Sequence, residues 1–177
     1  MQKNKKSYQD LTLDEAKKDS IVLAWGRFNP PTTGHEKLIN TVVAEARKRS
    51  ADYRIYPTKT TDPKKNPLTF KEKVRFMRKM FPRHARKISS DEGVNTVIKA
   101  AQKLEKEGYK NLTIIAGSDR VQEFNTLLNK YNNKEYTFVK IDVVSAGERD
   151  PDAENVSGMS ASKMRAAASA GDFASFK

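Results

Sequence analysis

The chain contains no cysteine among its 177 residues. This absence excludes disulfide bridges, thiolate zinc sites and a cysteine nucleophile, and it fits a reducing compartment. Long apolar runs are also missing, since none approaches the length needed to span a membrane, and the first ten residues lack the apolar core of a signal peptide. These absences predict a cytoplasmic protein with no membrane partner.

Basic residues outnumber acidic residues by 34 to 22, which gives a formal net charge of +12. Such an excess favours polyanionic partners, either a nucleic acid or a small phosphorylated ligand. The lysines and arginines are spread along every segment and mixed with acids. A surface that is simply basic therefore explains the charge better than a dedicated nucleic-acid face.

Short apolar runs alternate with segments of helical periodicity along the chain. The expected strands are Ile21 to Trp25, Tyr53 to Pro57, Ala85 to Ile88, Leu112 to Ala116 and Tyr136 to Val144. The expected helices are Gly34 to Arg49, Thr69 to Met80, Val94 to Glu107, Val121 to Tyr131 and Ser160 to Ala170. This alternation predicts a single α/β, Rossmann-like, three-layer domain at residues 20–177, with a mostly parallel sheet and helices on both faces. Residues 1–19 are expected to form a polar arm outside this domain.

The first expected strand leads through a loop with two prolines into a helix, in the stretch SIVLAWGRFNPPTTGHEKLI, Ser20 to Ile39. A strand that delivers a glycine-containing loop to a helix N-terminus is a common phosphate site, because backbone N–H groups and the positive end of the helix dipole meet there. Thr32, Thr33 and His35 lie at that point. In a parallel sheet, the loops Gly26 to Thr33, Thr58 to Pro67 and Gly117 to Asp119 would open on one rim.

Two motifs resemble those of the nucleotidylyltransferase superfamily. GRFNPPTTGH matches the first signature, G-x-F-x-P-x-(T/H)-x-G-H, and MSASKMR, Met159 to Arg165, is similar to the second, I-S-(S/T)-(S/T)-x-(I/V)-(R/K). The resemblance covers Ser20 to Phe176. It implies transfer of a nucleoside monophosphate from a nucleoside triphosphate to a phosphate-bearing acceptor, with release of pyrophosphate. The acceptor oxygen attacks the α-phosphorus in line, so the protein contributes positioning and charge stabilisation.

The resemblance also implies roles for the residues of the first motif. His35 and Thr32 would hydrogen-bond the phosphates, as catalytic groups. The residues implied in the nucleotide and acceptor pockets are Gly26, Arg27, Phe28 and Gly34. A histidine that only bonds its own helix start is the plainer alternative for His35, and the intact motif around it favours the functional role.

In the second motif, Ser160 and Ser162 would form another anion cradle at a helix start, and Arg165, one turn further on, would reach a phosphate. A serine N-cap beside a solvated arginine is the plainer alternative there. Lys64, in KKNPLTFKEKV, resembles a lysine of phosphopantetheine adenylyltransferases that binds the acceptor phosphate. Lys59 and Lys65 are close competitors for this role.

Gly117 and Asp119 belong to a GSD sequence that resembles the G-(A/S)-D element of nicotinamide mononucleotide adenylyltransferases. In those enzymes the carboxylate meets ribose hydroxyls, whereas an aspartate that caps a helix is the alternative here. The chain shows no set of metal ligands, so Mg²⁺ would arrive with the triphosphate.

The identity of the acceptor is open at this stage. GRF together with GSD favours nicotinamide mononucleotide as the acceptor and ATP as the donor. SAGDFASF after the second motif is similar to the end of phosphopantetheine adenylyltransferases, and NVSGMSASKMR is similar to glycerol-3-phosphate cytidylyltransferases, which use CTP. A basic nucleic-acid-binding domain without turnover is the alternative from another class. Relatives range from monomers to hexamers, so a homo-oligomer also stays open.

Overall fold

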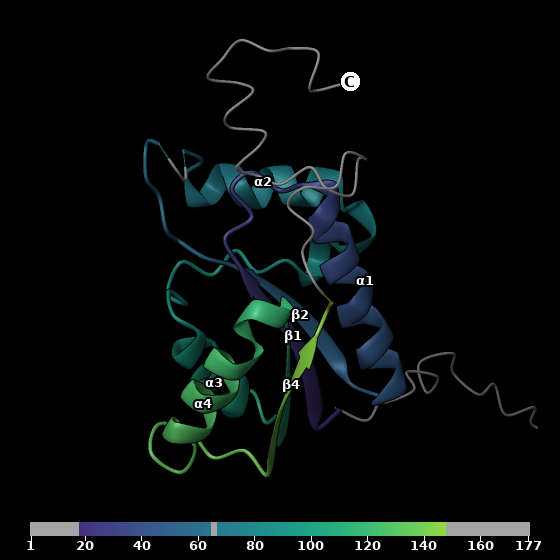
Figure 1. Ribbon diagram of the computed structural model, residues 1–177, viewed down its shortest axis with the longest axis vertical. Coiled ribbons are helices and arrows are strands. Elements are labelled where there is room, and N and C mark those ends of the chain that lie inside the picture. The colour runs from purple at the N-terminus through teal and green to yellow at the C-terminus, as the bar shows by residue number, and fades with distance from the viewer. Residues whose placement is uncertain (1–17, 65–66, 148–177) are drawn as a thin grey trace, which may run out of the picture.

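The computed structural model describes residues 18–64 and 67–147. Within these residues, four parallel strands form one sheet between two layers of helices, which confirms the predicted Rossmann-like architecture (Figure 1). The strands are β1 (Ser20–Gly26), β2 (Asp52–Pro57), β3 (Asn111–Ala116) and β4 (Lys140–Ser145). The helices are α1 (Thr33–Lys48), α2 (Phe70–Met80), α3 (Val97–Lys106) and α4 (Val121–Tyr131), with short 3₁₀ helices η2 (Pro82–Lys87) and η3 (Ser118–Arg120).

The order of the strands across the sheet is β2-β1-β3-β4. The chain moves from β1 to one side to form β2, and then returns to the other side of β1 to form β3. The connections after β1 and β3 therefore run in opposite directions, and the place between these two strands is the topological switch point of the sheet. Parallel sheets of this kind bind ligands there, in the crevice beyond the carboxyl ends of the strands.

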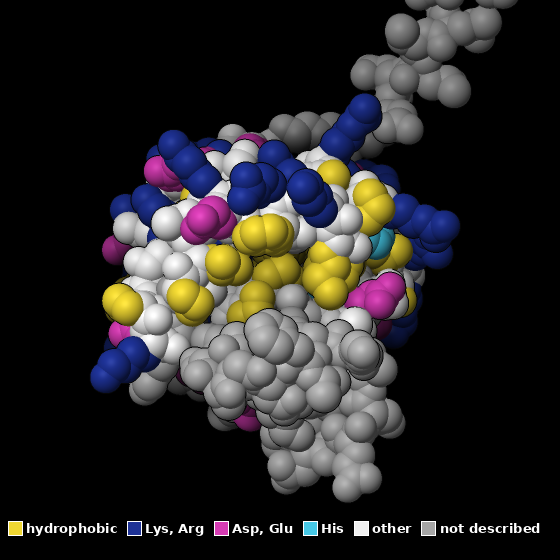
Figure 2. Space-filling view, turned by 90° about the horizontal axis from the view of Figure 1, so that it is seen from above, with side chains coloured by type: hydrophobic (Ala, Val, Ile, Leu, Met, Phe, Trp, Pro, Cys, Tyr) yellow, Lys and Arg dark blue, Asp and Glu magenta, His cyan; other side chains and the backbone are white. Residues whose placement is uncertain are grey.

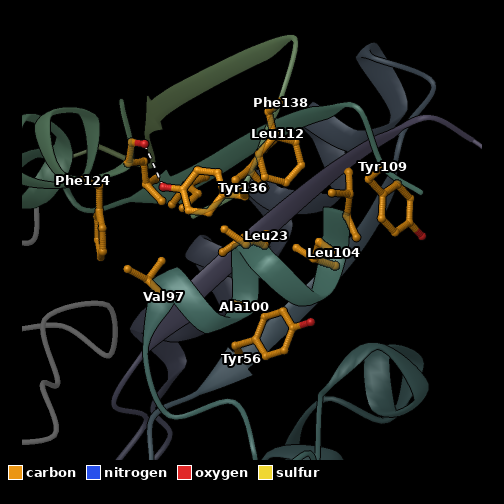
Figure 3. Packing of buried hydrophobic residues seen from close by; sticks show 14 of the residues in the cluster. Leu23, Tyr56, Val97, Ala100, Leu104, Tyr109, Leu112, Phe124, Tyr136 and Phe138 are labelled. Atoms are coloured by element: carbon orange, nitrogen blue, oxygen red, sulfur yellow. Dashed lines mark hydrogen bonds between the residues drawn. The ribbon is translucent and has the colours of Figure 1, made fainter. Parts of the chain in front are cut away.

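The side chains of β1 alternate between the two faces of the sheet, because successive residues of a strand point to opposite sides. Val22 and Ala24 belong to the apolar cluster formed with α1. Ile21 and Leu23 belong to the larger cluster on the other face, which receives residues of α3 and α4 (Figure 3). All four side chains are buried, and β1 is one of the two inner strands of the sheet, covered by apolar side chains on both faces.

Helix α2 lies across the carboxyl ends of the strands (Figure 1). It begins with the predicted capping box, in which the Thr69 backbone N–H donates to Glu72 Oε2 at 2.9 Å and the Glu72 N–H donates to Thr69 Oγ1 at 3.4 Å. Val74 and Met77 are buried in a cluster that also contains Phe28 of the loop after β1. The helix is thus packed directly against the loop that carries the first motif.

Most predicted elements match the structure to within about a residue at each end, and α4 matches at both ends. Helix α3 begins at Val97 rather than Val94, because Thr96 is its N-cap and accepts a hydrogen bond from the Lys99 N–H at 3.1 Å. The predicted helix at 160–170 and nearly all of the predicted arm lie outside the described residues.

The strand predicted from Ala85 to Ile88 is wrong. Pro82 begins the 3₁₀ helix η2, which continues to Lys87, and a proline is well suited to a first helical turn. Ile88 alone forms a parallel bridge, with Ile55 of β2. Ile88 therefore lies beside the sheet, as predicted, but the segment before it is helical.

Strand β4 begins at Lys140, four residues later than the predicted start at Tyr136. Asn132 bonds both backbone groups of Phe138, donating to its oxygen at 3.1 Å and accepting from its N–H at 2.9 Å. These bonds occupy the groups that a sheet would need. Tyr136 and Phe138 are still buried in the core, and the Tyr136 hydroxyl donates to the Leu128 oxygen at 2.7 Å (Figure 3).

Candidate active site

The loop after β1 lies at the switch point, next to the loops that follow β2 and β3. The Thr58 N–H, just beyond β2, donates to the Gly26 oxygen at 2.8 Å. Ala24 of β1 pairs with Ile115 of β3, so these strands end at the same edge of the sheet. The prediction that these three loops share one rim is confirmed for the described residues.

His35 and Thr32 form a local hydrogen-bonded unit at the start of α1. The Thr32 backbone N–H donates to His35 Nδ1 at 2.8 Å, and the Thr32 hydroxyl lies 2.9 Å from the same nitrogen. A nitrogen that accepts from a backbone N–H cannot itself carry a proton. In the neutral ring the proton is therefore on Nε2, which makes Nε2 a hydrogen-bond donor.

Phe28 sets the position of the imidazole. Its ring lies with its centroid 4.7 Å from that of His35, and the side chain is fully buried. The backbone of Phe28 has φ of 46°, a left-handed conformation that is uncommon for a bulky residue. A Cβ at Gly26 would lie 2.9 Å from the Phe28 ring, so this glycine is required by the close approach of the ring.

Asn29 joins the loop after β1 to the segment that precedes α2. Its amide donates to the Leu68 oxygen at 3.1 Å and accepts from the Leu68 N–H at 3.0 Å. The side chain is 2 % exposed, so these bonds lie away from water and are correspondingly costly to lose. We did not predict a role for Asn29, because nothing in its local pattern shows that the partner lies 39 residues away.

Lys73 of α2 is the second residue with a structural role that the sequence does not predict. Its side chain is 0 % exposed, and Nζ donates to the Thr58 oxygen at 2.6 Å and to the Thr60 oxygen at 3.4 Å. Burial lowers the pKa of Lys73 to about 8, and the positive charge of Arg27 acts in the same direction. The signal was present, since residues 70, 73, 74 and 77 share one face of a helix.

The buried charge of Lys73 predicts an unusual dependence of stability on pH. Between about pH 8 and 10.5 the unfolded chain keeps this proton while the folded chain loses it. The free energy of unfolding therefore increases as the pH rises through that window. The difference in free energy of unfolding between the wild type and Lys73→Met, measured by urea unfolding, should change in favour of the wild type as the pH rises between those values. Tyr109 and Tyr136, whose pKa burial raises to about 12, oppose this gain, but both proteins contain them. A constant difference would contradict the buried charge.

Other predicted site residues are more dispersed. Lys64 is exposed, with its backbone N–H bonded to Asp62 Oδ1 at 2.9 Å, whereas the Lys59 ammonium donates to the Glu92 oxygen at 2.9 Å. Asp119 is exposed within η3 and does not cap α4, whose N-cap is Arg120. The remaining described residues of the prediction are Gly34 and Arg27, both exposed, and Gly117, which is buried at the end of β3. Ser160, Ser162, Arg165 and the competing Lys65 lie outside the described residues.

The structure therefore brings part of the predicted site together. His35 contacts both Thr32 and Phe28, the Phe28 ring lies close to Gly26, and the loop after β2 is bonded to the Gly26 oxygen. Within residues 18–64 and 67–147, no group of three His, Asp or Glu side chains is arranged to hold a metal ion. In the same residues no helix has the length and apolar character to cross a membrane.

Comparison with known families agrees with this geometry. The model of the cytidylyltransferase-like family matches residues 23–167, which is most of the chain. The chain belongs to this family, which is part of the nucleotidylyltransferase superfamily. Membership supports a nucleotidyltransferase activity that uses a nucleoside triphosphate. A search among curated proteins finds no match.

Proposed function

We propose that the chain is an adenylyltransferase that moves AMP from ATP to a phosphate-bearing small molecule, preferably nicotinamide mononucleotide, and releases pyrophosphate. The observation that carries this proposal is the His35 unit at the start of α1. Its ring is fixed by Thr32 and Phe28, and its Nε2–H is a donor beside a helix N-terminus. Neutral donors and a helix dipole at one point are suited to triphosphate oxygens.

In this mechanism the chain stabilises charge and forms no covalent intermediate. The acceptor phosphate attacks the α-phosphorus, a P–O bond forms there, and the bond to the β-phosphate oxygen breaks, so pyrophosphate leaves. His35 Nε2 would donate to the oxygens on which charge develops, and Thr32, whose N–H and hydroxyl both lie against Nδ1, would hold the ring in that orientation. Lys64 would bind the acceptor, and Arg165 with Ser160 and Ser162 would hold the leaving phosphates.

The nucleotide would lie over the switch point between β1 and β3. Its pocket would be lined by residues of the loop after β1, the start of α1 and the end of β3, namely Gly26, Arg27, Phe28, Gly34 and Gly117. The Asp119 carboxylate would accept hydrogen bonds from the ribose hydroxyls. The described residues around this point offer mainly N–H, hydroxyl and cationic groups, so a Mg²⁺ ion would take its oxygen ligands from the triphosphate and water. When bound, such an ion offsets phosphate charge.

The structure also gives a reason to keep the nucleic-acid-binding alternative. From Phe70 to Lys87 the chain carries one acidic residue, Glu72, against Lys71, Arg75, Arg78, Lys79, Arg83, Arg86 and Lys87, in addition to the buried Lys73. Lysine and arginine side chains are prominent on the face that lies above the carboxyl ends of the strands (Figure 2). This alternative predicts binding to RNA or DNA that weakens steeply with salt and is not accompanied by nucleotide turnover.

A pyrophosphate-release screen tests the proposal. It crosses ATP and CTP, each with Mg²⁺, with nicotinamide mononucleotide, phosphopantetheine and glycerol 3-phosphate. We expect release with ATP and nicotinamide mononucleotide to exceed that of every other pair. Preference for CTP with glycerol 3-phosphate, or for phosphopantetheine, would replace the proposed substrates with those of the alternative families. Salt-sensitive nucleic-acid binding without release from any pair would favour the binding domain.

A further inference from the structure

The buried ammonium of Lys73 has no place in the mechanism above. It is 0 % exposed, and its two hydrogen-bond acceptors are neutral backbone oxygens, those of Thr58 and Thr60. No carboxylate within the described residues forms an ion pair with it. Burying a charge without a counter-ion is costly, so a residue that served only to pack α2 would be better replaced by an apolar one.

The two bonds fix the orientation of the peptide units that they contact. In a trans peptide unit, the C=O and the following N–H point in opposite directions. The oxygens of Thr58 and Thr60 point inward to Lys73, so the N–H groups of Lys59 and Thr61 point outward. Lys59, Thr60 and Thr61 are all exposed residues, which agrees with N–H groups that face the solvent side of the loop after β2.

These N–H groups have no hydrogen-bond acceptor among the described residues. A positive charge bonded to the oxygen of a peptide unit polarises that unit and strengthens its N–H as a donor. The Thr58 hydroxyl, at the start of the same loop, is buried and lacks a partner within residues 18–64 and 67–147. The loop thus combines two outward donors, an unsatisfied hydroxyl and a buried charge.

We propose that Lys73 is a positioning residue that aims the backbone N–H groups of Lys59 and Thr61 at a phosphate group. The identification of that group as the acceptor's phosphate rests on the proposed function, because the loop after β2 is where Lys64 would bind the acceptor. The anion site itself depends only on the geometry of the loop. Lys73 does not touch the phosphate and acts through the peptide units.

A titration of the uniformly ¹⁵N-labelled chain with inorganic phosphate tests the site without any turnover. We expect saturable changes in the amide signals of Lys59 and Thr61, with their protons moving downfield as they form hydrogen bonds. Changes confined to the start of α1, at Gly34 and His35, would overturn the proposal. This result would not depend on whether pyrophosphate release is ever observed, so the two proposals can fail separately.

Two variants of the same helix separate positioning from general electrostatics. Lys73→Met removes the buried charge, and we expect the phosphate dissociation constant read from Lys59 and Thr61 to rise by about fivefold or more. Lys71→Met removes one exposed charge from α2 and should change it by less than about twofold. Equal effects of the two variants would mean that the basic surface, and not the oriented loop, attracts phosphate.

A second neutral variant and a kinetic readout complete the test. Lys73→Gln keeps an N–H donor but loses the charge. It is used in place of Lys73→Met if the amide signals of the methionine variant are poorly dispersed, which would show that this variant does not fold. With the acceptor found in the screen, either variant should raise the KM for the acceptor and leave the KM for the triphosphate within about twofold. An equal rise in both constants would indicate a general structural defect and contradict the proposal.

Discussion

Replacing His35 with alanine is expected to reduce the rate of pyrophosphate release by about 100-fold or more, the usual effect of removing a group that stabilises transition-state charge. The ring is held on one side by the Thr32 N–H and packs at an angle of 48° against the Phe28 ring, so its Nε2–H has a fixed direction. The measurement is steady-state turnover with the preferred pair of substrates.

Two variants control for stability and for histidine content. His35→Gln keeps a side chain at the third helical position that can accept from the Thr32 N–H, as in an ordinary capping box, so it should restore the stability lost in His35→Ala but not the turnover. His84→Ala removes the chain's other histidine, which bonds the Tyr53 hydroxyl at 3.0 Å, and should leave turnover near wild type. Near-normal turnover in His35→Ala would show that the site is assigned wrongly.

Replacing Gly26 with alanine is expected to affect both stability and turnover. The added Cβ would lie 2.9 Å from the edge of the Phe28 ring, which is fully buried and cannot move toward solvent without opening the core. Overpacking of this kind costs about 1–3 kcal/mol in the free energy of unfolding. The displaced ring would also carry the His35 imidazole with it, so we expect turnover to fall by about tenfold or more.

The control for this variant is a second substitution that removes the clash. Combining Gly26→Ala with Phe28→Leu should recover part of the lost stability, measured by urea unfolding, but should leave turnover low because the support for the His35 ring is gone. Gly93→Ala tests an exposed glycine whose nearest contact is a carboxylate oxygen of Asp91 at 3.1 Å, and it should have little effect on turnover. Full additivity of the Gly26 and Phe28 changes would contradict the contact between them.

The sequence was informative wherever a local rule determined the structure. Strand β1, helix α1 and helix α4 follow from hydrophobic periodicity, and the start of α2 follows from the spacing of Thr69 and Glu72. The parallel sheet follows from the alternation of elements. The order β2-β1-β3-β4 required the structure, because it depends on the side of β1 to which the chain returns.

The residues that were missed depend on contacts between distant segments. Asn29 bonds Leu68, and Lys73 bonds the loop after β2, in each case through backbone groups whose position no local pattern reveals. Lys73 was overlooked because a lysine is usually exposed, although its position falls within the apolar face of α2. The β-forming residues Tyr136 and Phe138 predict the start of a strand, whereas Asn132 holds their segment apart from the sheet.

The most direct test of the central claim follows the two ends of the triphosphate separately. The reaction is run with ATP labelled with ³²P at either the α- or the γ-phosphate, together with the acceptor preferred in the screen. We predict that the α-label appears on the acceptor and the γ-label in pyrophosphate, and that both transfers are nearly absent with His35→Ala. A γ-label on the acceptor or in inorganic phosphate would show cleavage of a different bond and would contradict a nucleotidyltransferase reaction at this site.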